Sequence, residues 1–85
     1  MALDSEATKL LKAFGLAVRR QRKQLGLSQE RFAFAAEIDR TYVSGVERGV
    51  RNPTVKTIAR LAVALGTRPS RLFLAAERGA EGKRA

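Results

Sequence analysis

The feature that most constrains the fold is the regular spacing of residues that begin and end helices. Three favoured helix N-caps stand before segments with apolar residues three and four apart, namely Ser28, Asp39 and Thr54. Glycine, which is favoured just after a helix C-terminus, ends such segments at Gly26, Gly49 and Gly66. Alternation typical of strands is scarce. The pattern therefore predicts an all-α chain.

We predict five helices, over residues 6–25, 28–36, 39–48, 54–65 and 69–78. Asp4 or Ser5 would cap the first helix, and Pro69 would stand in the first turn of the last. Val55 is expected on the inner face of the fourth. Residues 79–85 carry no apolar stripe and are predicted to form a disordered tail. With 85 residues, the chain is long enough for one domain, 1–85, with a core over about 8–78.

Composition excludes several classes of function. The chain has a formal charge of +9 and neither cysteine nor histidine, so it lacks the commonest metal ligands and the commonest general base. No apolar run approaches the roughly 18–20 residues of a membrane span, and the acidic N-terminus differs from a signal peptide. We expect a cytoplasmic protein that is not an enzyme and needs no metal, cofactor or small-molecule ligand.

The positive charge is concentrated in two stretches. Residues 9–31 hold seven basic side chains against one acid, and residues 40–71 hold seven more against one acid. Twelve of the seventeen basic residues are arginine, whose planar guanidinium suits phosphate and guanine. This arrangement favours a polyanionic partner over a merely solvated basic surface.

Residues 28–49, SQERFAFAAEIDRTYVSGVERG, predict two short helices joined by about three residues. The small Ala33 in the first helix would let the two approach closely. Apolar residues of the second could then pack on Phe32 and Ala36. This is the pattern of a helix-turn-helix.

The chain resembles the phage Cro/repressor-type helix-turn-helix regulators over about residues 14–73, through FGLAVRRQRKQLGLSQE, DRTYVSGVERGVRNPT and IARLAVALG. Within that family, DRTYVSGVERGVRNPT looks most like the controller proteins of restriction–modification systems. The resemblance implies a compact five-helix, lambda-repressor-like domain that regulates transcription and is encoded by a bacterium or a phage. Three positions depart from it, and at one of them Gln21 stands where an apolar residue is usual. Glu37 stands where glycine is usual, so we expect the backbone to differ locally, and Phe34 stands where a polar residue is usual.

A helical wheel of residues 40–48 places Val43, Val46 and Glu47 toward the core. The opposite side would face the major groove of DNA. We expect Arg40, Thr41 and Ser44 to contact base edges and Gly45 to let the helix lie deep in the groove. The resemblance supports the same three contact residues.

Other residues are expected to contact the phosphate backbone. The resemblance implies this role for Gln29, and the loop after the second helix of the motif offers more candidates. The predicted phosphate contacts are Gln29, Tyr42, Arg48, Arg51 and Asn52, although Tyr42 could instead be a packing residue. Glu47, on the core side of the wheel, needs a partner, and the resemblance implies an ion pair with Arg22.

The consecutive Leu72, Phe73 and Leu74 predict a homodimer surface, because one helix cannot bury all three against its own domain. We expect Leu72 or Phe73 to be the exposed member. We therefore expect a sequence-specific regulator that binds double-stranded DNA as a homodimer on a near-palindromic operator. An antitoxin that regulates its own promoter is the first alternative. A basic protein of the membrane surface is a weaker one, since the apolar stripe of the first helix is needed for the core.

Overall fold

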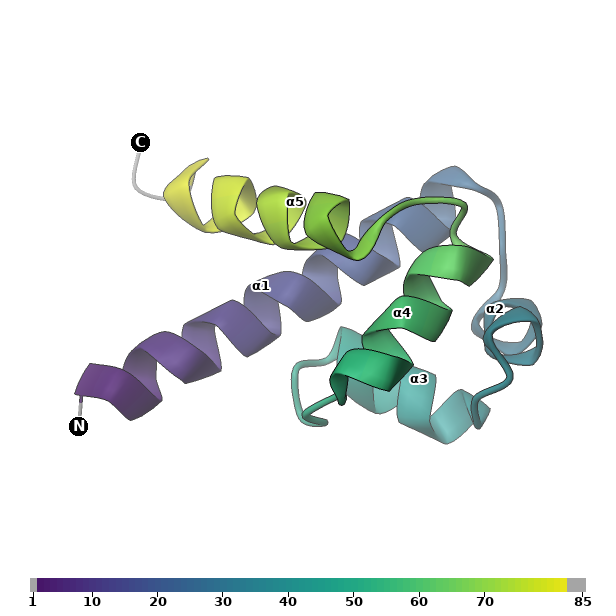
Figure 1. Ribbon diagram of the computed structural model, residues 1–85, viewed down its shortest axis with the longest axis horizontal. Helices are drawn as coiled ribbons and strands as arrows, with labels where there is room; N and C mark the ends of the chain where they lie inside the picture. Colours follow the sequence, from purple (N-terminus) through teal and green to yellow (C-terminus); the bar gives the residue numbers. More distant parts are fainter. Residues whose placement is uncertain (1, 83–85) are drawn as a thin grey trace.

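Five helices make up the part of the chain that the computed structural model describes, residues 2–82. In chain order they are α1 (Ala2–Gln24), α2 (Gln29–Ala36), α3 (Arg40–Glu47), α4 (Val55–Ala64) and α5 (Pro69–Gly82). The long α1 is accompanied by α5, while α2, α3 and α4 gather around its C-terminal half (Figure 1). The predicted all-α fold is confirmed. No helix within residues 2–82 is long and apolar enough to cross a membrane.

The three predicted internal N-caps are confirmed. The side-chain oxygens of Ser28, Asp39 and Thr54 accept hydrogen bonds from first-turn amides at 3.0, 2.8 and 3.1 Å. These bonds satisfy amides that have no partner within the helix. They place the starts of α2, α3 and α4 within one residue of the prediction.

The outer helices are longer than predicted. α1 begins at Ala2, so Asp4 and Ser5 lie inside the helix and do not cap it. No glycine or proline interrupts residues 2–5, and Asp4 in the first turn interacts favourably with the helix dipole. α5 continues to Gly82, so residues 79–82 of the predicted tail are helical. Residues 83–85 lie outside the described residues.

One hydrogen-bond pattern closes four of the helices. In each, a residue with positive φ donates to the carbonyl three positions back, and the next residue donates to the carbonyl five positions back. This Schellman motif uses Gly26, Gly49 and Gly66, but after α2 it uses Glu37, at φ 58° and ψ 45°. The expectation of a different local backbone at Glu37 is therefore wrong. The motif is kept, and the glutamate adopts the left-handed conformation that it requires.

The core lies between α1 and the other helices. Its largest fully buried side chains are Phe32, Leu61, Val18, Val43 and Val46. Phe14 of α1 packs on Phe73 of α5, with ring centroids 5.0 Å apart. α1 also approaches α3 so closely at Gly15 that a Cβ atom there would collide with the carbonyl oxygens of Val46 and Glu47. The helix-turn-helix is thus packed directly on α1.

The apolar trio of α5 does not form one surface. Leu72 is only 3% exposed and belongs to the core, and Phe73 is half-buried against Phe14. Leu74, at 43% exposed, is the member that faces solvent. The prediction that Leu72 or Phe73 is the exposed residue is wrong, because α5 turns these two side chains toward α1 and the core. Val55 is also wrongly predicted, since it is 83% exposed on α4.

Candidate nucleic-acid interface

The N-terminus of α3 is held by Asp39 and Thr41. Oδ1 of Asp39 accepts hydrogen bonds from the Thr41 amide at 2.8 Å and from the Thr41 hydroxyl at 2.7 Å. The hydroxyl bond and the amide bond lower the pKa of Asp39, against a small effect of burial, and the neighbouring Arg40 adds to the lowering. The Thr41 hydroxyl proton is therefore engaged inside the protein. The methyl group is left for contacts outside it.

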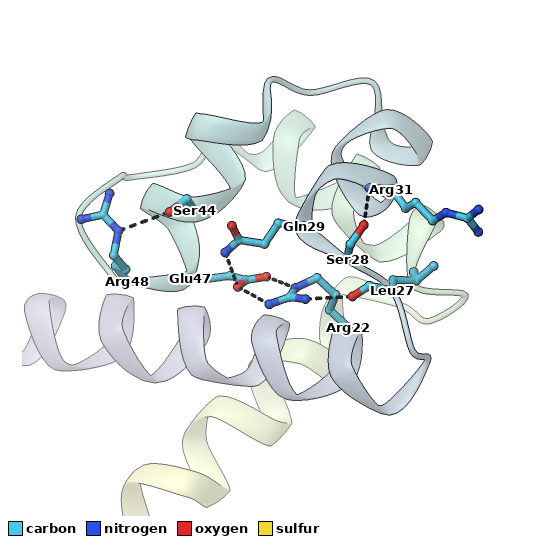
Figure 2. Close-up of polar contacts among 8 residues, drawn as sticks. All are labelled: Arg22, Leu27, Ser28, Gln29, Arg31, Ser44, Glu47 and Arg48. Carbon is cyan, nitrogen blue, oxygen red and sulfur yellow. Dashed lines mark hydrogen bonds and ion pairs between the residues drawn. The ribbon is translucent and has the colours of Figure 1, made fainter.

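The outer side of α3 carries short polar and cationic side chains. Arg40, Thr41 and Arg48 are exposed, and Ser44 is half-buried between them. Nε of Arg48 lies 3.4 Å from the Ser44 hydroxyl oxygen, to which it donates (Figure 2). Val43, Val46 and Glu47 are buried on the other side, as the wheel predicts. The structure thus brings the three predicted base-contacting residues onto one open face.

Arg51 folds back over this helix. Its side chain lies against Gly45, where a Cβ atom would collide with Cγ of Arg51. Its guanidinium carbon lies 5.7 Å from the centroid of the Tyr42 ring, within the range of a cation–π interaction. Gly45 is therefore buried beneath Arg51 and does not face outward, so its predicted role in the groove is wrong. The glycine instead lets Arg51 lie close to α3.

Arg22 and Glu47 form the expected ion pair, and both residues are buried. Nε of Arg22 donates to Oε2 of Glu47 at 2.7 Å, and Nη2 donates to Oε1 at 3.0 Å. Nη1 of Arg22 donates to the carbonyl oxygen of Leu27 at 2.8 Å. One guanidinium thereby joins α1, the end of α3 and the loop before α2 (Figure 2).

Gln29 extends this network toward the surface. Its Nε2 donates to Oε1 of Glu47 at 3.0 Å, so one of its two amide protons is used inside the protein. The residue is half-buried in the first turn of α2, beside the Ser28 cap. Sequence reasoning missed the bond to Glu47, since the two residues lie eighteen positions apart.

The remaining predicted phosphate contacts lie at the surface near α3. Arg51 and Asn52 are exposed in the loop between α3 and α4, and Tyr42 is half-buried at the edge of the core. Asn52 also borders an open hollow between α1, α4 and α5. Cationic and amide side chains thus lie at the surface near α3, and such groups are the usual partners of a phosphate backbone.

One apolar feature on α4 was not foreseen. Val55, Ala59 and Val63 are all exposed and stand four residues apart, on one side of the helix. The sequence contains this spacing, but it also contains a second apolar set on the same helix. That second set is the one that is buried, namely Ile58, Leu61, Ala62 and Leu65. The stripe adds exposed apolar surface to the helix that precedes α5.

The family model for "Helix-turn-helix" (HTH_3) matches residues 18–72. The control protein C.BamHI of Bacillus amyloliquefaciens is 42% identical over 61 residues, which cover 71% of this chain and 75% of that protein. The crystal structure of the restriction–modification controller protein C.AhdI from Aeromonas hydrophila is 48% identical. It superimposes with a TM-score of 0.72, covering 73% of this chain and 94% of that one.

A third similar protein has been solved on DNA. The structure of the controller protein C.Esp1396I, as a tetramer in complex with its natural 35 base-pair operator, is 30% identical to this chain. The TM-score is 0.77, and the match covers 84% of this chain and 93% of the other.

Proposed function

The chain belongs to the helix-turn-helix family HTH_3 and is a DNA-binding transcriptional regulator without enzymatic activity; from this premise we propose that it acts as a homodimer on a near-palindromic operator. α3 of each subunit lies in the major groove of one half-site. The protein acts in the cytoplasm, where its DNA is. Its similarity to C.BamHI and C.AhdI supports a role as the controller of a restriction–modification system.

The observation that carries this proposal is the open face of α3. Val43, Val46 and Glu47 of this helix are buried and hold it against the rest of the domain. Arg40 and Thr41 are exposed at its N-terminal end. In helix-turn-helix proteins this end of the recognition helix meets base edges. A rigid helix with an open polar face is suited to enter a groove without rearranging.

Each residue of that face has a chemical role in the proposal. Arg40 donates two hydrogen bonds to O6 and N7 of a guanine. The Thr41 methyl group contacts a thymine methyl, because its hydroxyl proton is engaged by Asp39. Ser44 bonds to a base edge of either kind. These contacts supply sequence preference.

Phosphate contacts fix the position of α3. Arg48, Arg51 and Asn52 contact one strand, and Tyr42 supports the Arg51 guanidinium from below. Gln29 uses its second amide proton, together with the free amides of the first turn of α2, to bind the other strand. Because Gln29 also bonds Glu47, its phosphate contact is linked to the ion pair that holds α1 against α3.

Dimerisation places two recognition helices on one face of DNA. We assign the self-association surface to α4 and α5, where Val55, Val63 and Leu74 expose apolar side chains. A two-fold axis makes such a contact self-complementary, and half-sites then lie about 34–36 Å apart.

Selection from randomised duplex DNA tests the proposal. The expected result is a consensus of two inverted half-sites whose centres are separated by about 10–10.5 base pairs. Recovery of unrelated sequences would contradict specific recognition. A single half-site bound by a monomer would contradict the dimer.

A further inference from the structure

An open groove of about 510 Å³ runs between α1 and α5. Small residues make up much of its lining, namely Ala13 and Ala17 of α1 and Ala75 and Gly79 of α5. Leu16 adds a larger apolar side chain that is 36% exposed. We name this surface the α1–α5 groove. Its centre is apolar and open to solvent.

Positive charge lies along the α1 wall of the groove. Lys9, Lys12 and Arg20 belong to the lining, and all three are exposed. The lining residues that the structure describes include no acid. Glu6, which is not a lining residue, accepts a hydrogen bond from Nζ of Lys9 at 3.4 Å, in an exposed pair that water screens. The α1 wall is therefore basic over about three turns of helix.

The α5 wall is basic as well. Arg71 and Arg78 are exposed, and they stand four residues before and three residues after Ala75. This spacing places both arginines on the side of α5 that carries Ala75. The side chain of Arg20 reaches toward this wall, since its Nη1 would lie 3.8 Å from a Cβ atom at Gly79. Cations thus border the apolar centre from both helices.

The groove favours a helix with several carboxylates as its occupant. Both walls are helices whose backbone groups bond within the helix, so an extended strand would find no free edge to pair with. Small residues four positions apart on each wall let a third helix approach closely. Cations spread along both walls suit several acids, whereas a fatty acid has a single carboxylate at one end. Duplex DNA would pair with the cations but leave the apolar centre uncovered.

We propose that the α1–α5 groove binds an amphipathic helix of another protein, with an apolar stripe between two rows of aspartate or glutamate. The lining extends from Lys9 to Gln24 along α1, which is about 22 Å or four turns of a bound helix. The groove contains no residue that we assign to DNA or to the dimer. Figure 1 shows α5 on one side of α1 and α3 on the other, so the chain could hold DNA and this partner together.

Selection from a displayed library of helical peptides tests the proposal, with the full chain as the target. Each peptide has about 16 residues, leucines fixed three and four positions apart, and flanking positions varied among glutamate, glutamine and lysine. The expected result is enrichment of glutamate on both flanks. The selected peptide is then labelled and titrated by fluorescence anisotropy at physiological salt. A scrambled peptide of the same composition should bind at least about tenfold more weakly, because its leucines form no stripe.

A steric variant locates the binding site. Ala75→Phe fills the groove without changing the charge of the chain, and it should weaken binding of the selected peptide by more than about tenfold. Ala35→Phe makes the same substitution at an exposed alanine of α2 and should change the affinity by less than about twofold. Circular dichroism confirms that each variant is folded.

A pair of charge variants separates local contacts from the overall charge. Lys9→Gln/Arg20→Gln should weaken the peptide by about 2–30-fold, the effect of losing two exposed ion pairs. Lys56→Gln/Arg60→Gln removes the same charge from exposed positions of α4. This control should change the affinity by less than about twofold, because salt screens charges that lie farther away than about 8 Å.

Several outcomes would overturn the proposal. A selection without enrichment of glutamate would do so, as would peptide binding that survives Ala75→Phe. Equal losses in the two charge variants would mean that only the overall charge attracts the peptide. Displacement of the peptide by random duplex DNA would assign the groove to DNA, and displacement by dodecanoate at a lower concentration than by unlabelled peptide would assign it to an anionic amphiphile. These measurements need no operator, so they are independent of whether the chain selects a DNA sequence.

Discussion

Nε2 of Gln29 donates a hydrogen bond to Oε1 of Glu47 at 3.0 Å, and this bond connects the proposed phosphate contact of α2 to the buried Arg22–Glu47 pair. The same carboxylate holds α1, through Arg22, against the end of α3. A side chain at the proposed DNA surface and the packing of the helix-turn-helix on α1 therefore depend on the same carboxylate. Changes at Glu47 should affect both stability and binding.

Glu47→Ala should destabilise the fold by about 3–5 kcal/mol, because it leaves the buried guanidinium of Arg22 without its carboxylate. Urea unfolding measures the loss, and Glu77→Ala, which truncates an exposed acid of α5, serves as the control. The double variant Arg22→Met/Glu47→Leu should recover most of the stability, since it removes both charges together. A small loss in the single variant would mean that the pair contributes little.

Glu37→Gly should stabilise the fold by about 0.5–1 kcal/mol. The left-handed conformation costs a non-glycine residue about 1–2 kcal/mol, and the greater flexibility of glycine in the unfolded chain offsets part of the gain. Glu77→Gly, within α5, should be destabilising by about 1 kcal/mol. Thermal and urea unfolding of both variants measure these changes in stability. An unfolding midpoint of Glu37→Gly equal to that of wild type would show that the left-handed conformation of Glu37 carries no strain.

Arg40→Ala and Arg51→Ala should differ in the kind of binding that they weaken. Arg40→Ala should lose about 1–3 kcal/mol on the selected site and relax the preference at one base pair of each half-site. Arg51→Ala should weaken all sequences about equally and reduce the salt dependence. Titrations on specific and random duplexes separate the two effects. Equal proportional losses in both variants would contradict the assignment of Arg40 to base contacts.

Affinity should fall steeply with salt. A dimer with two to four ionic contacts per subunit releases enough counterions to give a log–log slope of about −4 to −7. Titrations between low and physiological salt measure this slope on the selected site. A slope near zero would exclude binding dominated by phosphate contacts.

Leu74→Glu should give a folded monomer with much weaker operator binding, because the exposed leucine lies on the proposed dimer surface. Leu72→Ala should instead destabilise the fold by about 2–5 kcal/mol, since Leu72 lies in the core. Sedimentation equilibrium at micromolar concentration, with circular dichroism, distinguishes the two results. A wild-type chain that stays monomeric both free and on a single operator would refute the dimer and the palindromic operator together.

Local signals in the sequence were sufficient for much of this architecture. Ser28, Asp39 and Thr54 cap helices because a short side-chain oxygen satisfies amides only a few residues away. The wheel of α3 located the buried Val43 and Val46 and the open Arg40 and Thr41, because helical periodicity is itself local. The arginine-rich, histidine-free composition also limited the possible chemistry.

The sequence by itself determined the order of the helices, the helix-turn-helix and the side of α3 that stays open, because each depends on residues close together along the chain. Only the tertiary structure decided that Leu72 is buried while Leu74 is exposed, that Gly45 lies beneath Arg51, and that Gln29 bonds Glu47. These features depend on how separate helices rotate and approach one another. The rotation and approach of the helices depend on the packing of the whole core, in which many weak contacts compete. No single segment of the sequence therefore predicts them.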